Sequence, residues 1–578
     1  MAEGQGAVRH LGHALVELLR EHGVDTIYGL PGGQTQALYS AVADTAGALR
    51  HMVVRDERTA AYAADAHARL TGGVGVCDAT VGPGAAKLPS GLGEAFNSSV
   101  PVLALVSELA TSTEARRYRG ATSQALDQEA LLAPVTKWVG TVRRAQDLAP
   151  VVRRAFREAT TGRPGPVAVI LPVDVLDGPP PDAPVHDPHA PRFGRFPALR
   201  VHPDPADVAA VADLVVAAER PLLVAGGGAR LAGAHEAVAA LVGWLPVATT
   251  LSGKGVLDET QPAALGVLGS LGTSAAAAAA ERADLLVLAG TKLGSATSLG
   301  WTLPRAAQEV AVIDVDPVEL GRDLAVDALL HADARLGLEA LGRELAAHPP
   351  ERRPAWWSAV AGFRAAWQAQ KDREGGIDTT PVAPQRLVRE LQPLLTGRDV
   401  VVADASLSSG WVGAYLEVGG HGPRTLLPRG LAGLGWAVPA AIGAAVAAPD
   451  ARIVAVMGDG AAAYAVGELA TLRQEHLDVK LIVLNNQSLG WIRWYRRVTD
   501  APGWEQPDLP ATDFAAVAAA YGLPARRVEA PGELAGALRD LLDRPGPGLV
   551  EVVTETWQTP LADHREAVAA GRSAGYGI

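Results

Sequence analysis

The sequence predicts an α/β protein built from three doubly wound, parallel-sheet domains. Short apolar runs of strand length alternate with longer helical patterns along almost the whole chain of 578 residues. A proline-rich stretch at 179–191 and a loose segment without clear periodicity at 349–381 divide this alternation into three blocks. Because parallel strands are joined through helices, each block is expected to fold around its own parallel sheet.

The three blocks predict domains at residues 1–185, 195–350 and 375–562, followed by a C-terminal tail at 563–578. In the first block we expect helices at 14–22 and 59–70. The strands expected in the first two blocks lie at 26–28, 74–80, 102–106, 167–171, 221–225, 285–289 and 310–315.

Composition excludes several classes of protein. A net charge of −12 argues against a nucleic-acid surface, and 48% hydrophobic residues suffice for large cores. The single cysteine, Cys77, excludes a disulfide framework and suits a reducing cytoplasm. Residues 430–448 carry no charge, but their Gly, Ala and Pro content fits a buried loop and helix better than a membrane span. We therefore expect a cytoplasmic protein that does not bind membranes.

The most informative motif is Gly458-Asp459-Gly460, followed after 24 intervening residues by Asn485-Asn486. Asparagine occurs only three times in the chain, so two adjacent asparagines indicate a chemical need for an amide oxygen. Strands are expected at 452–457 and 479–484, with a helix at 461–475 between them. Both halves of the motif would then follow neighbouring strands at the edge where open α/β sheets bind ligands.

The chemistry of this motif suits a phosphate group bound through a metal ion. Glycines let the backbone approach an anion, and the start of the following helix attracts negative charge. The Asp459 carboxylate and the Asn486 amide oxygen are hard ligands of the kind that Mg²⁺ prefers. The alternative is an ordinary Asp-Gly turn beside an Asn-Asn loop, which the spacing and strand contexts make less favoured.

This motif resembles the binding motif of thiamin diphosphate enzymes. The resemblance implies that Asp459, Asn486 and the backbone carbonyl of Ser488 hold the Mg²⁺ that anchors the diphosphate. For the segment 430–435, the resemblance also implies that Leu434 bends the cofactor and that the Ala432 carbonyl accepts a hydrogen bond from the cofactor's aminopyrimidine. The further cofactor-binding positions that it implies are Ser408, Gly458, Gly460, Ala461, Leu489 and Gly490.

Glu57 is the candidate for activating the cofactor. Thiamin diphosphate removes its own reactive proton when a carboxylic acid polarises the distal ring nitrogen of its pyrimidine, and such an acid should be shielded from water. The segment 54–61 resembles the family segment that ends a strand and carries this glutamate, and Gln124 resembles an active-site glutamine of the family. The alternative for Glu57 is a residue that only interacts with a helix dipole.

The resemblance covers nearly the whole chain and extends to its assembly. Residues 28–33, 80–84 and 97–101 look like further active-site signatures of the family. It implies a pyrimidine-binding first domain, a transhydrogenase-like central domain and a diphosphate-binding third domain. Because the family's glutamate meets cofactor held by another subunit, a homodimer would be the smallest active unit and a homotetramer is expected.

The segment 485–490 resembles both acetolactate synthase and benzaldehyde lyase, and the segments 126–128, 134–138 and 318–322 lean towards benzaldehyde lyase. They imply a carboligase or lyase that makes or breaks a C–C bond beside a carbonyl, through an enamine, with 2-oxo acids, acyloins or aldehydes as substrates. The paired histidines of pyruvate decarboxylase are absent from the first domain, which favours carboligation. Two alternatives stay open: a 2-oxo acid decarboxylase that does not ligate, and a non-catalytic nucleotide-binding regulator with the same fold.

Several residues are candidates for contacting the substrate. Gln34 and Gln124 could hydrogen-bond its oxygens, Gly33 lies in the same loop as Gln34, and Arg429 could pair with a carboxylate. Gln34 and Arg429 could equally face solvent or a subunit interface. Trp491 could wall the acceptor pocket together with Trp494, or both could be core aromatics on one helix face.

The central domain carries a glycine-rich turn at 225–229 and the segment 313–317 with two aspartates. In acetolactate synthase the comparable region binds FAD, and in acyl-CoA relatives it binds ADP. Residues 290–294 depart from the acetolactate synthase pattern, which has an arginine and paired aspartates, so the resemblance to FAD-binding proteins is weak here.

Overall fold

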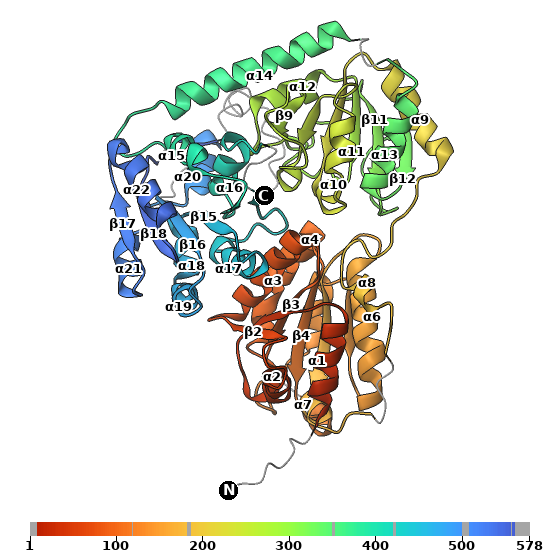
Figure 1. Cartoon of the computed structure of the whole chain (residues 1–578), viewed down its shortest axis with the longest axis vertical. Coiled ribbons are helices and arrows are strands. Elements are labelled where there is room, and N and C mark those ends of the chain that lie inside the picture. Colours follow the sequence, from red (N-terminus) through yellow and green to blue (C-terminus); the bar gives the residue numbers. More distant parts are fainter. Residues whose placement is uncertain are drawn as a thin grey trace. The chain divides into compact units, whose positions relative to one another are not determined.

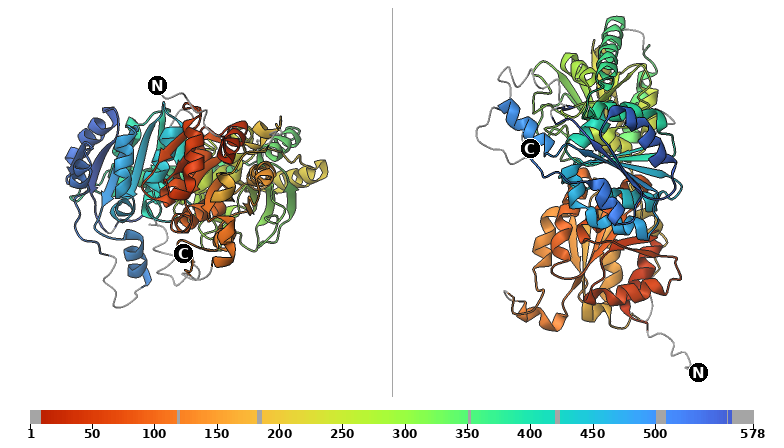
Figure 2. Two further views of the ribbon diagram at one scale, coloured as in Figure 1. Left: turned by 90° about the horizontal axis from the view of Figure 1, so that it is seen from below. Right: turned by 90° about the vertical axis from the view of Figure 1, so that its left-hand side faces the viewer.

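The structure is a computed structural model that describes residues 9–117, 120–181, 186–349, 353–419, 424–499, 508–556 and 558–560. These residues divide into two compact units, one formed by residues up to 199 together with 442–447, and the other by the rest. Within the described residues lie three six-stranded sheets, seen from three directions in Figures 1 and 2. All neighbouring strands in these sheets are parallel, which confirms the predicted fold class.

The first unit contains one sheet with strand order β2-β1-β3-β4-β6-β5. Its strands are β1 (Thr26–Gly29), β2 (Arg50–Val53), β3 (Gly75–Ala79), β4 (Val102–Glu108), β5 (Trp138–Thr141) and β6 (Val167–Pro172). Its helices are α1 (Leu11–Glu21), α2 (Gln36–Ala43), α3 (Glu57–Thr71), α4 (Leu88–Ser98), α5 (Gln128–Leu132), α6 (Leu148–Thr160), α7 (Val173–Leu176) and α8 (Ala190–Phe193).

The second unit contains two sheets, of which the central one has the order β12-β11-β10-β7-β8-β9. Counted in chain order this is 6-5-4-1-2-3, the order of dinucleotide-binding sheets. Its strands are β7 (Pro221–Ala225), β8 (Val247–Thr249), β9 (Ala264–Val267), β10 (Leu285–Ala289), β11 (Glu309–Asp314) and β12 (Ala328–His331). Its helices are α9 (Pro205–Ala217), α10 (Gly227–Leu231), α11 (His235–Ala240), α12 (Ser274–Arg282) and α13 (Ala334–Leu345).

The C-terminal sheet has the order β14-β13-β15-β16-β18-β17, which repeats the order of the first sheet. Its strands are β13 (Asp399–Ala403), β14 (Arg424–Leu426), β15 (Arg452–Gly458), β16 (Val479–Asn485), β17 (Ala525–Val528) and β18 (Gly548–Val553). Its helices are α15 (Pro384–Leu391), α16 (Leu407–Gly410), α17 (Ala437–Ala447), α18 (Asp459–Tyr464), α19 (Leu469–Gln474), α20 (Gly490–Thr499), α21 (Phe514–Ala520) and α22 (Pro531–Asp543).

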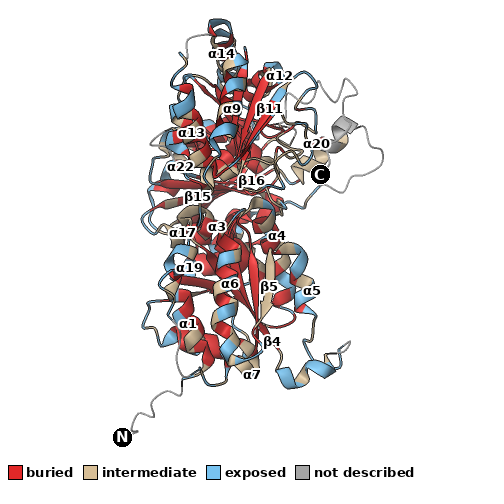
Figure 3. Ribbon diagram, turned by 90° about the vertical axis from the view of Figure 1, so that its right-hand side faces the viewer, coloured by how far each residue is buried: buried red, intermediate tan, exposed pale blue. Residues whose placement is uncertain are grey.

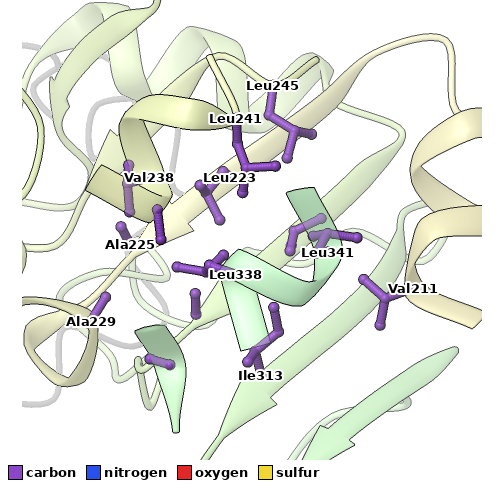
Figure 4. Close-up of a cluster of buried hydrophobic side chains, with 14 of the residues drawn as sticks. Val211, Leu223, Ala225, Ala229, Val238, Leu241, Leu245, Ile313, Leu338 and Leu341 are labelled. Atoms are coloured by element: carbon purple, nitrogen blue, oxygen red, sulfur yellow. The ribbon is translucent and has the colours of Figure 1, made fainter. Parts of the chain in front are cut away.

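Inner strands such as β4, β10 and β16 are buried along their whole length, as their continuous apolar runs predict, whereas the edge strands β2, β5, β12 and β17 are partly exposed (Figure 3). In the central sheet, alternate residues of β10 belong to two separate hydrophobic clusters. Val287 lies in the cluster that includes Leu338 and Leu341 of α13, shown in Figure 4, whereas Leu286 and Leu288 lie in the cluster under α12. Helices therefore cover both faces of this sheet, which is the doubly wound arrangement.

Two expectations about helices were wrong. The segment 349–381, expected to be loose, contains the long helix α14 (Pro354–Gly375). The single helix expected at 461–475 is two shorter helices, α18 and α19, joined by a 3₁₀ turn at Val466–Glu468, and α18 begins at Asp459 itself. The C-terminal tail predicted at 563–578 lies outside the described residues, and so do residues 182–185 of the proline-rich stretch.

No helix in the described ranges is long and apolar enough to cross a membrane. The uncharged stretch at 430–448 forms a loop followed by α17, as expected.

A buried ion cluster ties α3 to α4 in the first unit. Arg69 donates to Asp65 and to Glu94, each at 3.0 Å, and both carboxylates are fully buried. Replacing Arg69 with methionine should leave two buried carboxylates without their cation and lower the free energy of unfolding by about 3–5 kcal/mol. Chemical denaturation of the purified variant measures this loss, and a change below about 1 kcal/mol would show that the cluster contributes little.

Candidate active site

The C-terminal sheet brings the halves of the Asp459 motif together. β15 and β16 are parallel neighbours with Gly458 paired to Leu484, so Asp459 and Asn486 follow adjacent strands at one edge, as predicted. β13 pairs with the other side of β15, and Asp404 follows it at the same edge. The strand order reverses between β13 and β15, and open α/β sheets bind ligands at such a switch point.

Asp459 has a buried carboxylate with one oxygen available for a ligand. Its Oδ1 accepts from its neighbour's backbone, the N–H of Gly460, at 2.8 Å. Among the described residues no donor is aligned to hydrogen-bond with Oδ2, although this atom is buried. Burial raises the pKa of Asp459 to about 6, against the opposing effect of backbone N–H donors of Gly460, Gln487 and Ser488. An oxygen of this kind is suited to a divalent cation.

The two adjacent asparagines have different surroundings in the fold. Asn485 is buried, and its Nδ2 donates to Oε1 of Glu551 at 2.6 Å and to the Thr512 carbonyl at 2.9 Å. Asn486 is half-buried, and its Oδ1 accepts from the backbone of Ser488 at 3.1 Å. Asn485 therefore holds the strand end in place, and Asn486 presents an amide oxygen at the ligand edge.

The described residues contain no group of three or more His, Cys, Asp or Glu side chains that could hold a metal ion. A cation at this edge would therefore depend on the mixed set of Asp459, Asn486 and the Ser488 backbone. That set consists of hard oxygen donors, and the residues present thus fit Mg²⁺.

The glycines of the motif leave room for close packing. A Cβ atom at Gly460 would lie 2.9 Å from Cδ2 of Leu489, and one at Gly490 would lie 3.0 Å from Nδ2 of Asn486. A Cβ atom at Gly458 would face Oγ of Ser408 at 4.0 Å. The predicted cofactor positions after β13, β15 and β16 are therefore neighbours in the fold, and the buried Ala461 lies in the first turn of α18.

Ser406, two residues after Asp404, has a backbone conformation that L-residues rarely adopt, with φ 69° and ψ −141°. Glycine reaches this region without a steric penalty. The variant Ser406→Gly should therefore raise the free energy of unfolding by about 1 kcal/mol. Thermal denaturation of the two proteins side by side measures the difference, and a less stable variant would contradict this account.

The loop between β14 and α17 carries the positions expected to grip the pyrimidine. Ala432 has a positive φ of 53°, and Gly435 has a φ of 85° with its backbone packed against Cβ of Tyr464. Leu434 and Arg429 are half-buried. The backbone of this loop is thus strained at a non-glycine residue, a feature common at functional sites.

The two tryptophans of α20 are in edge-to-face contact, with ring centroids 6.2 Å apart. Trp494 is buried in the core cluster of the C-terminal sheet, and Trp491 is half-buried and packs against that cluster. Trp494 is therefore a core aromatic. A substrate contact by Trp491 stays a prediction.

In the first unit, Glu57 begins α3 directly after its N-cap residue, Asp56. Its side chain is buried, and a Cβ atom at Gly84 would lie 2.9 Å from Oε1. No donor in the described part of the chain is aligned to hydrogen-bond with Oε2, but Nζ of Lys87 lies 3.1 Å from it and 3.3 Å from Oδ2 of Asp56. Glu57 thus has the shielding from water that a proton-handling carboxyl needs.

Gln34 and Gln124 are brought together, as their predicted shared role requires. Nε2 of Gln34 donates to Oε1 of Gln124 at 3.2 Å, and Oε1 of Gln34 accepts from Thr80 at 3.0 Å. Gln124 is exposed and has a positive φ of 66°, with its backbone against Gly82. Gly33 is exposed, and a Cβ atom there would meet nothing within 4 Å.

Two residues beside this group were missed by the sequence reasoning. Gln128 is buried; its Oε1 accepts from the Gly82 backbone at 3.2 Å, and its Nε2 donates to Oε2 of Glu108 at 2.8 Å. Lys87 has a raised pKa, because the nearby carboxylates of Glu57 and Asp56 outweigh the lowering effect of burial. Gln128 lies in the segment 126–128, whose resemblance to benzaldehyde lyase was its one signal in the sequence, whereas no local pattern pointed to Lys87.

Three family models match consecutive parts of the chain. The N-terminal TPP binding domain of thiamine pyrophosphate enzymes matches residues 9–131, the central domain of these enzymes matches 208–341, and the C-terminal TPP binding domain matches 404–552. With the fold and the two groups of site residues, these matches define the class: a thiamin diphosphate-dependent enzyme that acts on C–C bonds.

Proteins that are similar to this chain over almost its full length show which family of thiamin diphosphate enzymes it belongs to. The chain is 34% identical to an acetolactate synthase large subunit of Parasynechococcus marenigrum, over 93% of this chain and 86% of the relative. It is 32% identical to a probable acetolactate synthase large subunit of Methanocaldococcus jannaschii (94% and 91%) and 31% identical to the isozyme 3 large subunit of Escherichia coli (92% and 92%). The chain belongs to the acetolactate synthase family of thiamin diphosphate enzymes.

Proposed function

We propose that this protein is a thiamin diphosphate- and Mg²⁺-dependent carboligase that joins a 2-oxo acid or related donor to a second carbonyl compound. The observation that carries the proposal is the buried Oδ2 of Asp459, for which no described residue supplies an aligned donor, beside Asn486 at the switch point of the C-terminal sheet. The relatives are acetolactate synthases by name, which supports ligation rather than plain decarboxylation.

In this proposal Asp459, Asn486 and the Ser488 carbonyl hold Mg²⁺, and the loop with Ala432 and Leu434 holds the pyrimidine. When bound, thiamin diphosphate supplies a nucleophilic carbon that adds to the donor carbonyl. Each remaining task belongs to side chains of this protein. They position the cofactor, exclude water and move protons.

Glu57 has the proton-handling role. In this proposal its side chain, shielded from water, hydrogen-bonds a ring nitrogen of the pyrimidine and exchanges a proton with it, while Nζ of Lys87 lies 3.1 Å from Oε2. Gln34 and Gln124, joined by a hydrogen bond, present amide groups to the substrate oxygens. Arg429 pairs with the substrate carboxylate.

The active assembly in this proposal is a homodimer or a pair of dimers. Glu57 lies in one unit of the chain and Asp459 in the other. In the enzymes that the chain resembles, the glutamate of one subunit contacts the cofactor bound by another subunit. The single, buried Cys77 suits a reducing compartment, and we place the enzyme in the cytoplasm. FAD is left out of the proposed cofactor set, because residues 290–294 lack the arginine and paired aspartates of the FAD-binding pattern.

Calorimetric titration of the cofactor-free protein with thiamin diphosphate, with and without Mg²⁺, tests the proposal. Binding should require Mg²⁺ and be lost in Asp459→Ala. Pyruvate, alone and with benzaldehyde, is then added to the loaded enzyme and the products are separated by chromatography. Accumulation of acyloin or acetolactate supports ligation, whereas free aldehyde alone would indicate a decarboxylase. A wild-type protein that binds no thiamin diphosphate would overturn the proposal.

A further inference from the structure

Asp404 is a fully buried carboxylate at the end of β13, on the ligand edge of the C-terminal sheet. Its Oδ1 accepts from the backbone of Ala405 at 2.9 Å and from that of Gly435 at 3.1 Å. Its Oδ2 accepts from the backbone of Ala437 at 2.7 Å. One carboxylate therefore joins its own strand end to a segment more than thirty residues away along the chain.

The residues that it holds are the end of the pyrimidine loop and the beginning of α17, since Gly435 closes that loop and Ala437 is the first residue of the helix. Both are backbone donors, so the contact specifies the path of the chain whatever the side chains are. Helix starts leave N–H groups without partners inside the helix, and a carboxylate is the acceptor that satisfies them best.

The loop needs this support because its backbone is strained. Ala432 has a φ of 53°, and Gly435 at φ 85° packs so closely on Tyr464 that a Cβ atom would lie 2.5 Å from Cβ of Tyr464. Strained residues persist only where surrounding contacts over-determine them. Burial raises the pKa of Asp404 to about 6, because a buried negative charge is unfavourable. The backbone N–H donors partly compensate for this cost of burying the charge.

Resting on the proposed function, we infer that Asp404 is a positioning residue that fixes the loop carrying Leu434 and the Ala432 carbonyl for the pyrimidine half of thiamin diphosphate. It acts through the backbone of Gly435 and Ala437 and touches neither the metal ligands nor the diphosphate site. Its removal should therefore weaken recognition of the pyrimidine half and leave recognition of the diphosphate half unchanged.

Two ligands separate these halves: thiamin diphosphate with Mg²⁺, and inorganic pyrophosphate with Mg²⁺, which offers only the diphosphate chemistry. In Asp404→Asn an amide replaces one accepting oxygen with a donor, so at least one backbone N–H loses its acceptor. Calorimetry on the full-length, cofactor-free protein should show affinity for thiamin diphosphate weakened roughly 10- to 100-fold, with pyrophosphate binding within about twofold of wild type.

Gly435→Ala provides a second variant, because it displaces the same end of the loop without touching the buried carboxylate. It should show the same selective loss. Asp399→Asn is the matched control: Asp399 is buried at the opposite end of the same strand, where it pairs with Arg452 at 2.7 Å. That variant should be less stable in thermal denaturation but should bind both ligands as the wild type does.

Thiamin diphosphate binding that is unchanged in Asp404→Asn and Gly435→Ala would overturn the inference. Equal weakening of both ligands would also overturn it, since Asp404 would then support the whole edge and not the loop. If the wild-type protein binds pyrophosphate with Mg²⁺ but does not bind thiamin diphosphate, the inference about Asp404 is wrong, whereas the proposed metal site still stands. Binding of neither ligand would defeat the proposed function itself.

Discussion

The variant Asp459→Asn is expected to lose Mg²⁺-dependent binding of thiamin diphosphate and, without metal, to be more stable than the wild type at pH 8. Loss of an outer partner of a metal ligand weakens a site 10- to 100-fold, so loss of the charged ligand itself should weaken it by about 100-fold or more. Calorimetry with thiamin diphosphate and Mg²⁺ measures the affinity.

The gain in stability follows from the pKa of Asp459, which burial raises from 3.8 to about 6. A raised pKa means that the folded protein favours the protonated form, so ionisation above pH 6 destabilises it by roughly 3 kcal/mol at most. Asparagine removes this effect. The advantage of the variant should be full at pH 8, decline as the pH falls through 6, and vanish near pH 4.

Thermal denaturation across this pH range is the measurement, and Mg²⁺ with pyrophosphate is the control. The ligand should stabilise the wild type and leave the variant unchanged. A variant that is less stable at pH 8 would show that the Asp459 carboxylate contributes to the fold, which contradicts its assignment as a poised metal ligand.

Glu57→Gln should lower kcat by about 10²- to 10⁴-fold, the range over which a positioned acid or base contributes to catalysis. Glutamine keeps the shape of the buried side chain and cannot exchange a proton with the pyrimidine ring. Binding of pyrophosphate with Mg²⁺ should be unchanged, because the residues proposed to hold it lie in the other unit. Steady-state kinetics at saturating cofactor, together with exchange of the cofactor's reactive proton for deuterium, measure the effect.

Glu94→Gln is the matched control for Glu57, since Glu94 is also buried in the first unit but pairs with Arg69 in the ion cluster. This variant should lose stability and keep kcat within a fewfold of the wild type once loaded with cofactor. A Glu57→Gln enzyme with wild-type turnover would leave the role of Glu57 to another group.

Some helices could be predicted from the sequence and others could not, and α14 shows the reason. Trp356 and Val360 at its beginning pack into a cluster of the central sheet, whereas Trp367 packs against that cluster and against the core of the C-terminal sheet. A helix that serves two cores places apolar residues on more than one face, so the single-sided periodicity that predicts a helix is absent. The same stretch therefore looked loose in sequence.

Asp404 and Lys87 illustrate a second kind of information that local patterns lack. Asp404 sits between alanines, and its partners Gly435 and Ala437 follow about thirty residues later. Lys87 reaches Glu57 from a different element. A carboxylate or an ammonium has no periodicity of its own, so its partner is defined only when the chain is folded.

The sequence by itself determined the class of fold and its parallel strands, and it predicted the chemistry of the main motif. Continuous apolar runs are local properties, and local backbone preferences translate them directly into strands and turns. Only the tertiary structure decided that Asn485 supports the fold and that Asp404 holds the loop after β14. Those roles depend on which atoms meet across strands, and the packing of the whole sheet sets those distances.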